Sequence, residues 1–229
     1  MFLGVFALPL ESRLFRAFFN DPSVPMRINV TVGTDKARAW HGIWPLRLAA
    51  PAVAHVLSRV AASTPKIIYN GGVKFFVDDA FMALTMQLQW PGRVTDGIKG
   101  IWNSTPGGPL YRAMLPWWKA GCRIHVHSNG DAAQDATCEA LAALQRTHPR
   151  FDHRFCFEHF GVSSESLVRR VKALGANVSI NPYYPHLRGA LNVAHLGVER
   201  AHTASRLKLA LDAGLVVACH SDCPVAPPR

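Results

Sequence analysis

Residues 122–131 read C-R-I-H-V-H-S-N-G-D. Apolar and polar residues alternate from the start of this stretch, and a period of two predicts a strand with His125 and His127 on one face. The Ser-Asn-Gly-Asp turn that follows ends the strand, and Asp131 is a suitable N-cap for a helix over residues 132–146. We therefore predict a βα unit, and in barrels of such units the carboxyl ends of strands carry the chemistry.

The rest of the chain repeats this order of elements. Alternating or β-branched stretches predict strands at 27–32, 72–77, 153–159, 176–180 and 215–220. Helical spacing predicts helices at 11–20, within 33–65, and at 110–120, 163–174 and 203–213. Residues 78–109, with several tryptophans, prolines and glycines, predict a long irregular connection of the kind that often covers a functional site. This order predicts an α/β fold with a parallel sheet, either a barrel or a doubly wound sheet.

Length and composition limit the class of protein. A chain of 229 residues makes one large domain or two small ones. No apolar run is long enough to cross a membrane and the apolar start has no basic leader, so we expect neither a membrane partner nor a signal peptide. Three of the cysteines, Cys122, Cys156 and Cys219, fall inside predicted strands. Buried free thiols suit a reducing compartment, which predicts a cytoplasmic protein.

The net charge of +10 raises the question of an acidic partner. Only 17% of the residues are charged and the arginines are scattered, so the sequence has no basic stripe that would follow a nucleic acid. We therefore expect no nucleic-acid partner. A basic nucleic-acid binder is kept as an alternative, and it predicts salt-sensitive binding to DNA or RNA.

Four side chains with ligand or acid–base chemistry fall in or just after predicted strands: Lys74, His127, His159 and Asp222. In a closed barrel they would converge, and imidazoles with a carboxylate suit Zn²⁺ or a similar divalent cation. Asp222 could also act as a base that takes a proton from metal-activated water. A buried ammonium beside a dication would be costly, so Lys74 should be neutral or modified.

Simpler explanations of the same residues stay open. A lone strand histidine is more often a hydrogen-bonded core residue, Asp222 could equally be a turn residue, and Lys74 could extend to the rim. We assign His125 and His220 to packing or hydrogen bonding.

Three residues after the strand at 176–180 are candidates for substrate binding: Tyr183, Tyr184 and His186. Their place after a strand could let them line a pocket. The alternative is that they are ordinary loop residues.

Four motifs carry a resemblance to a known family: G-V-K-F-F-V-D-D at 72–79, H-V-H-S-N-G-D-A-A at 125–133, F-E-H at 157–159 and A-C-H-S-D-C-P-V at 218–225. With these motifs in this order, the chain resembles the metal-dependent amidohydrolase superfamily. Within it, the chain is similar to the branch of N-substituted formamide deformylases, amidohydrolase family 3. The resemblance covers nearly the whole chain from about Arg27, and its H-x-N-G-D and H-S-D-x-P-V elements are specific in combination.

The resemblance implies a (β/α)8 barrel with one or two zinc ions at its carboxyl-terminal mouth. It implies that His127 and His159 are metal ligands and that Lys74, often carbamylated in the family, bridges two metals. Asp222 would bind metal and shuttle the proton. The implied reaction is hydrolysis of a C–N bond in a small, non-peptide amide by metal-activated water.

The chain also departs from the family pattern. The H-x-H pair of the family's first strand is not found, because the H-V-H at 125–127 precedes N-G-D and matches the fifth strand. Asp79 stands where the family usually has glycine, and the chain stops at Arg229, before the family's final helix and small β domain.

These departures predict that residues 1–229 form an internal fragment with impaired activity. The fragment would be an incomplete TIM-type barrel, from about the second or third strand to the eighth, that lacks the first strand and the small β domain. The alternative is a catalytically inactive remnant that only binds or packs against a partner. Assembly into a homo-oligomer is compatible with either.

Overall fold

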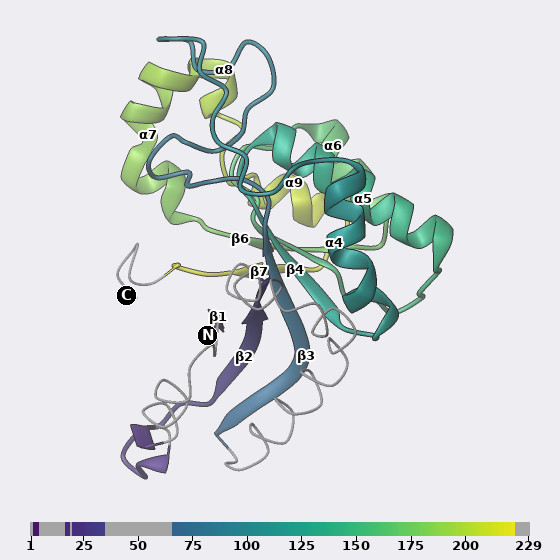
Figure 1. The fold of residues 1–229 in the computed structure, drawn as a ribbon. Coiled ribbons are helices and arrows are strands. Elements are labelled where there is room, and N and C mark those ends of the chain that lie inside the picture. The colour runs from purple at the N-terminus through teal and green to yellow at the C-terminus, as the bar shows by residue number, and fades with distance from the viewer. Residues whose placement is uncertain (1, 5–16, 19, 35–65, 223–229) are drawn as a thin grey trace. The chain divides into compact units, whose positions relative to one another are not determined.

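The computed structural model describes residues 2–4, 17–18, 20–34 and 66–222 (Figure 1). The helix predicted within 33–65 lies outside the described residues, as does most of the helix predicted at 11–20. The chain divides into two compact units, of which the first comprises residues 1–75 and 114–125, and the second residues 76–113 and 126–229.

The first unit holds parallel strands: β1 (Phe2–Gly4), β2 (Ile28–Gly33) and nearly all of β3 (Ile67–Phe76). Strand β2 confirms the strand predicted at 27–32. Strand β3 begins earlier than predicted because the turn-like sequence Asn-Gly-Gly at 70–72 forms a bulge within the strand. The register with β2 shifts there, and Gly71 adopts a φ of 78°, which glycine tolerates best.

The second unit holds the end of β4 (Arg123–Ser128), then β5 (Cys156–His159), β6 (Asn177–Ile180) and β7 (Val217–Cys219). These strands are neighbours in chain order, and β6 is parallel to both β5 and β7. Each lies within a stretch predicted to be a strand, which confirms the predicted order. Strand β5 starts later than predicted because the chain turns at Arg154, whose φ is 49°.

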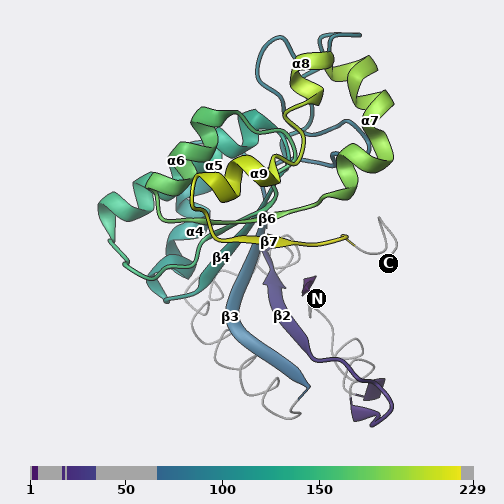
Figure 2. The same cartoon turned by 180° about the vertical axis from the view of Figure 1, so that it is seen from behind.

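Helix α4 (Gly108–Lys119) precedes β4, and three helices that lie between the strands from β4 to β7 are α5 (Asp131–Thr147), α6 (Glu165–Ala173) and α9 (Leu207–Asp212). All four were predicted from helical spacing, although α9 begins later than residue 203. Helices α5, α6 and α9 lie side by side along the strands (Figure 2). Ser164 caps α6, since the Leu167 N–H donates to the Ser164 hydroxyl oxygen at 3.2 Å.

The prediction that Asp131 caps α5 is wrong. The N-cap is Gly130, and Asp131 is the first helical residue. Its carboxylate instead accepts the backbone N–H of Gln89 at 2.8 Å and that of Ala132 at 3.0 Å. A carboxylate in the first turn still suits the helix dipole, and here it also binds the irregular connection.

The alternative that Tyr183, Tyr184 and His186 are ordinary loop residues is also wrong, because α7 (Tyr183–Leu196) and α8 (Val198–Ala201) follow β6. Two prolines this close together, at 182 and 185, are typical of a turn. Pro182 is however the N-cap and Pro185 lies in the first turn, where a missing N–H has no helical partner to lose.

The connection at 78–107 is irregular, as predicted, and packs against α7. Phe81 stacks on Tyr184 with ring centroids 4.1 Å apart, inside a local apolar cluster. The Arg188 guanidinium donates to the Met82 carbonyl, and Arg200 donates to the Gly92 carbonyl at 2.7 Å. The connection and helices α7 and α8 therefore form one layer.

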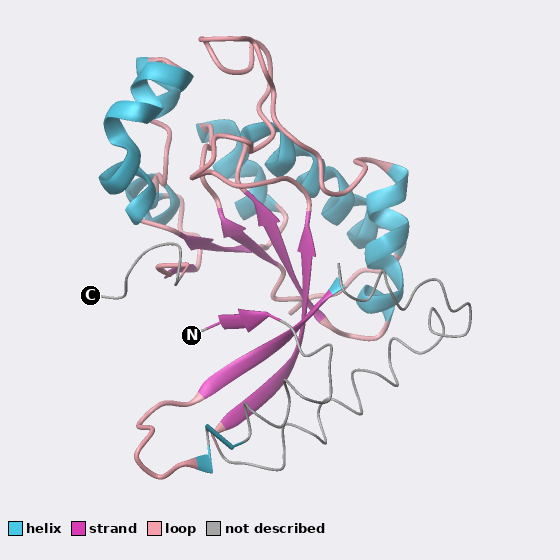
Figure 3. Ribbon diagram, turned by 60° about the vertical axis from the view of Figure 1, so that its left-hand side comes forward, coloured by secondary structure: helices cyan, strands magenta, loops and turns pink. Residues whose placement is uncertain are grey.

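The carboxyl end of β4 faces this layer. The N–H of Val77, where the connection begins, donates to the carbonyl of His127 at 3.0 Å. Figure 3 shows strand arrowheads directed toward the irregular loops. The described elements thus form an α/β fold with parallel strands. Among the described residues, no helix is both long and apolar enough to span a membrane.

Candidate functional site

Three of the predicted ligands lie together in the second unit. His127 is near the end of β4, His159 ends β5 and Asp222 follows β7. The ring centroids of His127 and His159 are 4.4 Å apart, and Nδ1 of His159 lies 3.8 Å from Oδ2 of Asp222. Two imidazoles and a carboxylate therefore converge, and their roles as metal ligands stay a prediction.

A further imidazole, that of His220, contacts this group. Its Nε2 lies 3.0 Å from Nδ1 of His159, and its Nδ1 lies 2.8 Å from Oγ of Ser179. The backbone N–H of His220 donates to the carbonyl of Ile180 at 3.1 Å. His220 therefore hydrogen-bonds, as we expect from the sequence, but it does so to a predicted ligand.

The backbone is strained where these side chains leave their strands. The φ angles of His159, Phe160 and Asp222 are 71°, 48° and 57°, in the left-handed region that residues other than glycine rarely adopt. Each such residue costs about 1–3 kcal/mol, and strain of this kind concentrates at functional sites. Two of the three converging side chains are thus held by unfavourable backbone conformations.

Asp78 lies beside His127 and is completely buried. Its carboxylate accepts the backbone N–H groups of Gln87, Asn129 and Gly130 at 3.0, 2.9 and 2.8 Å. Its Oδ1 lies 3.8 Å from Nε2 of His127. Burial raises the pKa of Asp78 to about 7, and the backbone N–H donors oppose this rise.

Asn129, in the turn after β4, contacts His127 directly. Its Nδ2 lies 3.0 Å from Nε2 of His127 and donates to the carbonyl of Asp79 at 3.0 Å. That carbonyl oxygen also lies 3.1 Å from Nε2 of His127. The Nε2 edge of the ring is therefore held by the start of the connection and by the turn.

The predicted substrate-binding residues lie at the start of α7. Tyr184 is buried in the apolar cluster, whereas Tyr183 is half-buried and His186 is exposed. Burial raises the pKa of the Tyr184 phenol, and the nearby carboxylate of Asp222 raises it further. The phenol therefore stays protonated at neutral pH. The role of all three residues in substrate binding stays a prediction.

Lys74, the fourth predicted ligand, belongs to the first unit. It lies on β3 and is half-buried, and its carbonyl accepts the Thr34 hydroxyl at 2.8 Å. Its role at a metal and its carbamylation stay predictions.

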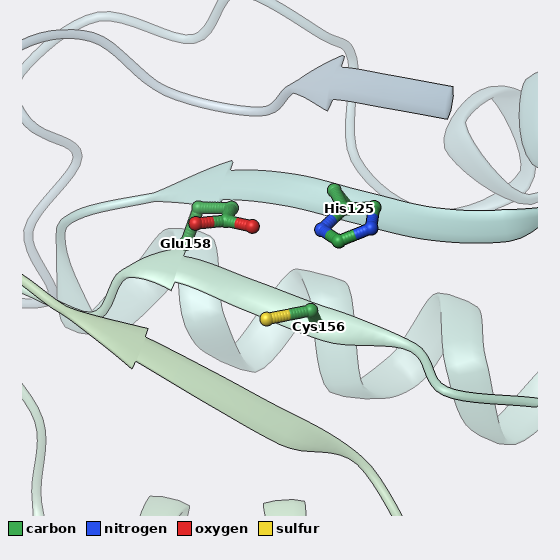
Figure 4. Close-up of side chains that lie close together, drawn as sticks. All are labelled: His125, Cys156 and Glu158. Atoms are coloured by element: carbon green, nitrogen blue, oxygen red, sulfur yellow. The ribbon is translucent and has the colours of Figure 1, made fainter. Parts of the chain in front are cut away.

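Other buried groups with metal-binding chemistry are Cys156 and Glu158 on β5 and His125 on β4, the last of which belongs to the first unit (Figure 4). Cys156 and Glu158 alternate with Phe157, so they lie on the opposite face of the strand from that ring. The Cys156 thiol donates to the Phe157 carbonyl at 3.7 Å, as buried structural cysteines do. By the same alternation, Cys156 and Glu158 lie on the opposite face of β5 from His159.

The chemistry of the convergent set fits a divalent cation. Imidazole nitrogen and carboxylate oxygen are the donors that zinc takes in catalytic sites. The Asp222 side chain is 37% exposed, so solvent can reach this carboxylate. His127, His159 and Asp222 would hold such an ion.

The sequence did not point to Asp78 or Asn129 as residues of this site. It did indicate that His220 packs or hydrogen-bonds, but not that it contacts a predicted ligand. Each stands inside a motif that the sequence shows, V-D-D, S-N-G-D and C-H-S-D. The signal for Asp78 was an acidic residue directly after a buried strand. Its partners are backbone groups remote in sequence, which a pattern of side chains does not reveal.

A family model described as "Amidohydrolase family" matches residues 41–229. The protein named "Putative amidohydrolase YtcJ", from Bacillus subtilis (strain 168), is 25% identical over 224 residues, which cover 92% of this chain and 39% of that protein. This chain thus spans about two fifths of the length of the curated relative it matches.

Two solved structures share the fold. An uncharacterized metal-dependent hydrolase from Pyrococcus furiosus aligns with a TM-score of 0.71 at 20% identity, covering 99% of this chain and 42% of that one. A second uncharacterized metal-dependent hydrolase, from Pyrococcus horikoshii OT3, aligns with a TM-score of 0.69 at 19% identity, covering 94% of this chain and 39% of that one. At these identities the likeness concerns the fold.

Proposed function

The chain belongs to the amidohydrolase family, and from this premise we propose that it carries part of the active site of a metal-dependent hydrolase. The reaction would be cleavage of a C–N bond in a small, non-peptide amide. The observation that carries the proposal is the convergence of His127, His159 and Asp222. We propose that the fold is an incomplete TIM-type barrel. The parallel strands, which are neighbours in chain order, support this.

In this proposal His127, His159 and Asp222 would hold a zinc ion, and Lys74 would be the further ligand that the family resemblance implies. When bound, the ion would act as a Lewis acid toward the amide carbonyl and the attacking water. Asp222, whose carboxylate is partly exposed, would take the proton from that water and return it to the leaving nitrogen. His220 keeps the His159 ring in place through the contact at Nδ1.

The substrate would lie against the first turn of α7. Tyr184, kept protonated by burial, can donate a hydrogen bond to a substrate oxygen, and Tyr183 and His186 flank it. We place the substrate among N-substituted formamides and related small amides, on the strength of the motifs that carry the family resemblance.

The compartment would be reducing, and therefore the cytoplasm. Cys122, Cys138 and Cys156 are all buried as free thiols, which supports this assignment.

The test is a calorimetric titration of the full chain with Zn²⁺. We expect the wild type to bind zinc and His127→Ala to bind it at least 100-fold more weakly, because the variant loses a ligand. The matched control is His202→Ala, since His202 is an exposed histidine at the C-cap of α8. A wild type that binds no zinc, or a His127→Ala variant with unchanged affinity, would contradict the proposal.

The zinc-loaded chain is then assayed on N-substituted formamides and N-acetylated amines by detection of the released amine. Turnover that is lost in His127→Ala supports the hydrolase assignment. Zinc binding without turnover instead favours the alternative, an inactive piece that only binds or packs against a partner.

A further inference from the structure

We propose that Asp78 is a positioning residue: its buried carboxylate fixes the connection at Gln87 against the Asn129–Gly130 turn and thereby orients the imidazole of His127. The effect of Asp78 on metal binding rests on the proposed function, because it requires His127 to be a ligand. The effect of Asp78 on the two segments and on the ring of His127 is independent of the proposed function.

One carboxylate binds two segments that are far apart in the sequence. Oδ1 of Asp78 accepts the N–H of Asn129, and Oδ2 accepts the N–H groups of both Gln87 and Gly130. Three backbone N–H groups from two segments therefore converge on the two oxygens of one side chain. Because Asp78 is 0% exposed, no water competes for these donors from outside.

The backbone contact between the two segments is independent evidence that they are held together. A β-carbon built on Gly130 would lie 1.9 Å from the carbonyl oxygen of Gln87, so only glycine allows this approach. On the other side of the turn, the Asp131 carboxylate accepts the N–H of Gln89 at 2.8 Å. The segment from Gln87 to Gln89 therefore follows the turn closely.

The carboxylate of Asp78 also fixes the groups that contact the imidazole of His127. The partners of His127 at Nε2 are the carbonyl oxygen of Asp79, at 3.1 Å, and Nδ2 of Asn129, at 3.0 Å. Asp78 precedes the first of these residues and binds the backbone of the second. Metal-binding histidines are commonly oriented by a carbonyl or carboxylate at their other nitrogen, and loss of such a partner typically costs 10–100-fold in metal affinity.

The test compares Asp78→Asn with Asp96→Asn in the full chain. Asparagine keeps the shape of the side chain but replaces one acceptor oxygen with an NH₂ group, which cannot accept the N–H groups now bound. Asp96 is the matched control because it is a carboxylate of the same connection that also accepts a backbone N–H, that of Ile98 at 3.0 Å, but is exposed.

We expect Asp78→Asn to speed amide exchange at Gln87 and Gly130 at least tenfold and to broaden or shift the ring ¹⁵N signals of His127 in the metal-free chain. We also expect its zinc affinity to fall 10–100-fold. Asp96→Asn should change none of these. Unchanged His127 ring signals in Asp78→Asn would overturn the proposal.

The outcomes for the two proposals are distinguishable. A wild-type chain that binds no zinc contradicts the proposed function, while the metal-free ring signals of His127 still decide the role of Asp78. If Asp78→Asn fails to fold, the second variant is Asp78→Glu, which keeps the carboxyl group but moves it by one methylene. Shifted or broadened ring signals of His127 in that variant support the proposal, and unchanged signals overturn it.

Discussion

The two ends of the segment 153–159 each carry a buried histidine, and the two differ in their partners. At the amino end, Nδ1 of His153 accepts the N–H of Phe155 at 3.0 Å, and its Nε2 lies 3.0 Å from the carbonyl oxygen of Leu174. At the carboxyl end, His159 meets the side chains of His220 and Asp222 and has a φ of 71°.

From this difference we infer that His153 serves the fold, whereas His159 is placed to serve the chemistry proposed above. Two backbone partners fix the tautomer of His153, so its ring serves as a neutral link between β5 and the end of α6. The partners of His159 are ionisable side chains, and the backbone of His159 itself is strained. We therefore expect these contacts to add little to the free energy of unfolding. The comparison agrees with the general rule that the amino-terminal face of such strands serves stability and the carboxyl-terminal face serves function.

The largest expected effect on stability tests that comparison directly. His153→Ala should lower the free energy of unfolding by about 3 kcal/mol, because it removes a buried ring and leaves the buried N–H of Phe155 and the partly buried carbonyl of Leu174 without this partner. His159→Ala should cost only about 1 kcal/mol, since its partners can reach solvent. Denaturant unfolding of both variants measures the difference, and an equal or larger loss in His159→Ala would refute the assignment.

A second variant tests how tightly the carboxyl end is packed. Gly130→Ala should cost about 2 kcal/mol, because its new β-carbon meets the backbone of Gln87 and the segment has to move. Gly189→Ala is the control, since a β-carbon there has no atom within 4 Å and the residue lies inside α7. That control should be neutral or gain up to about 1 kcal/mol from helix propensity. Equal unfolding midpoints for the two variants would argue against the close approach.

A third comparison measures the strain at the carboxyl end. His159→Gly should be about 1 kcal/mol more stable than His159→Ala, because glycine adopts a positive φ without steric cost. Chemical denaturation of the two variants gives the difference. If His159→Gly is the less stable of the two, the left-handed conformation at this position does not hold in solution.

The smallest expected effect is on the pH dependence of the free energy of unfolding. Burial lowers the pKa of His153 below its usual value of 6.5, so below pH 6.5 the unfolded chain binds a proton that the folded chain does not. The stability that His153 contributes is therefore fully present above pH 6.5 and is lost as the pH falls through the lowered pKa. His153→Gln, which can keep both hydrogen bonds without titrating, should show a smaller loss between pH 7 and pH 5. An identical slope in wild type and variant would contradict this.

Much of the fold could be predicted because local patterns specify it. The alternation in 122–127 and the β-branched run at 27–32 predicted β4 and β2, and helical spacing predicted α5 and α6. Helix α7 was missed because its two prolines resemble turn residues, although both stand where a helix tolerates them. The early start of β3 was missed because a bulge and a turn use the same residues, Asn-Gly-Gly.

The side chains that converge at the site could be predicted from the sequence, whereas the residues that hold them in place could be predicted less well. His127, His159 and Asp222 could be selected because each falls at or just after the carboxyl end of a predicted strand, and the carboxyl ends of parallel strands meet at one edge. The importance of Asp78 could not be predicted, because it depends on the backbone of Gln87 and Gly130, which lie in separate segments. Whether Lys74 joins the set depends on how the first unit meets the second, and this stays a prediction.

The account depends most on one claim, that His127, His159 and Asp222 bind a single cation. Anomalous diffraction at the zinc absorption edge, from crystals of the full chain grown with Zn²⁺, tests this claim directly. We expect an anomalous peak about 2.0–2.2 Å from a ring nitrogen of His127, a ring nitrogen of His159 and a carboxylate oxygen of Asp222. A zinc-loaded crystal whose only anomalous peaks lie away from these three side chains would contradict it.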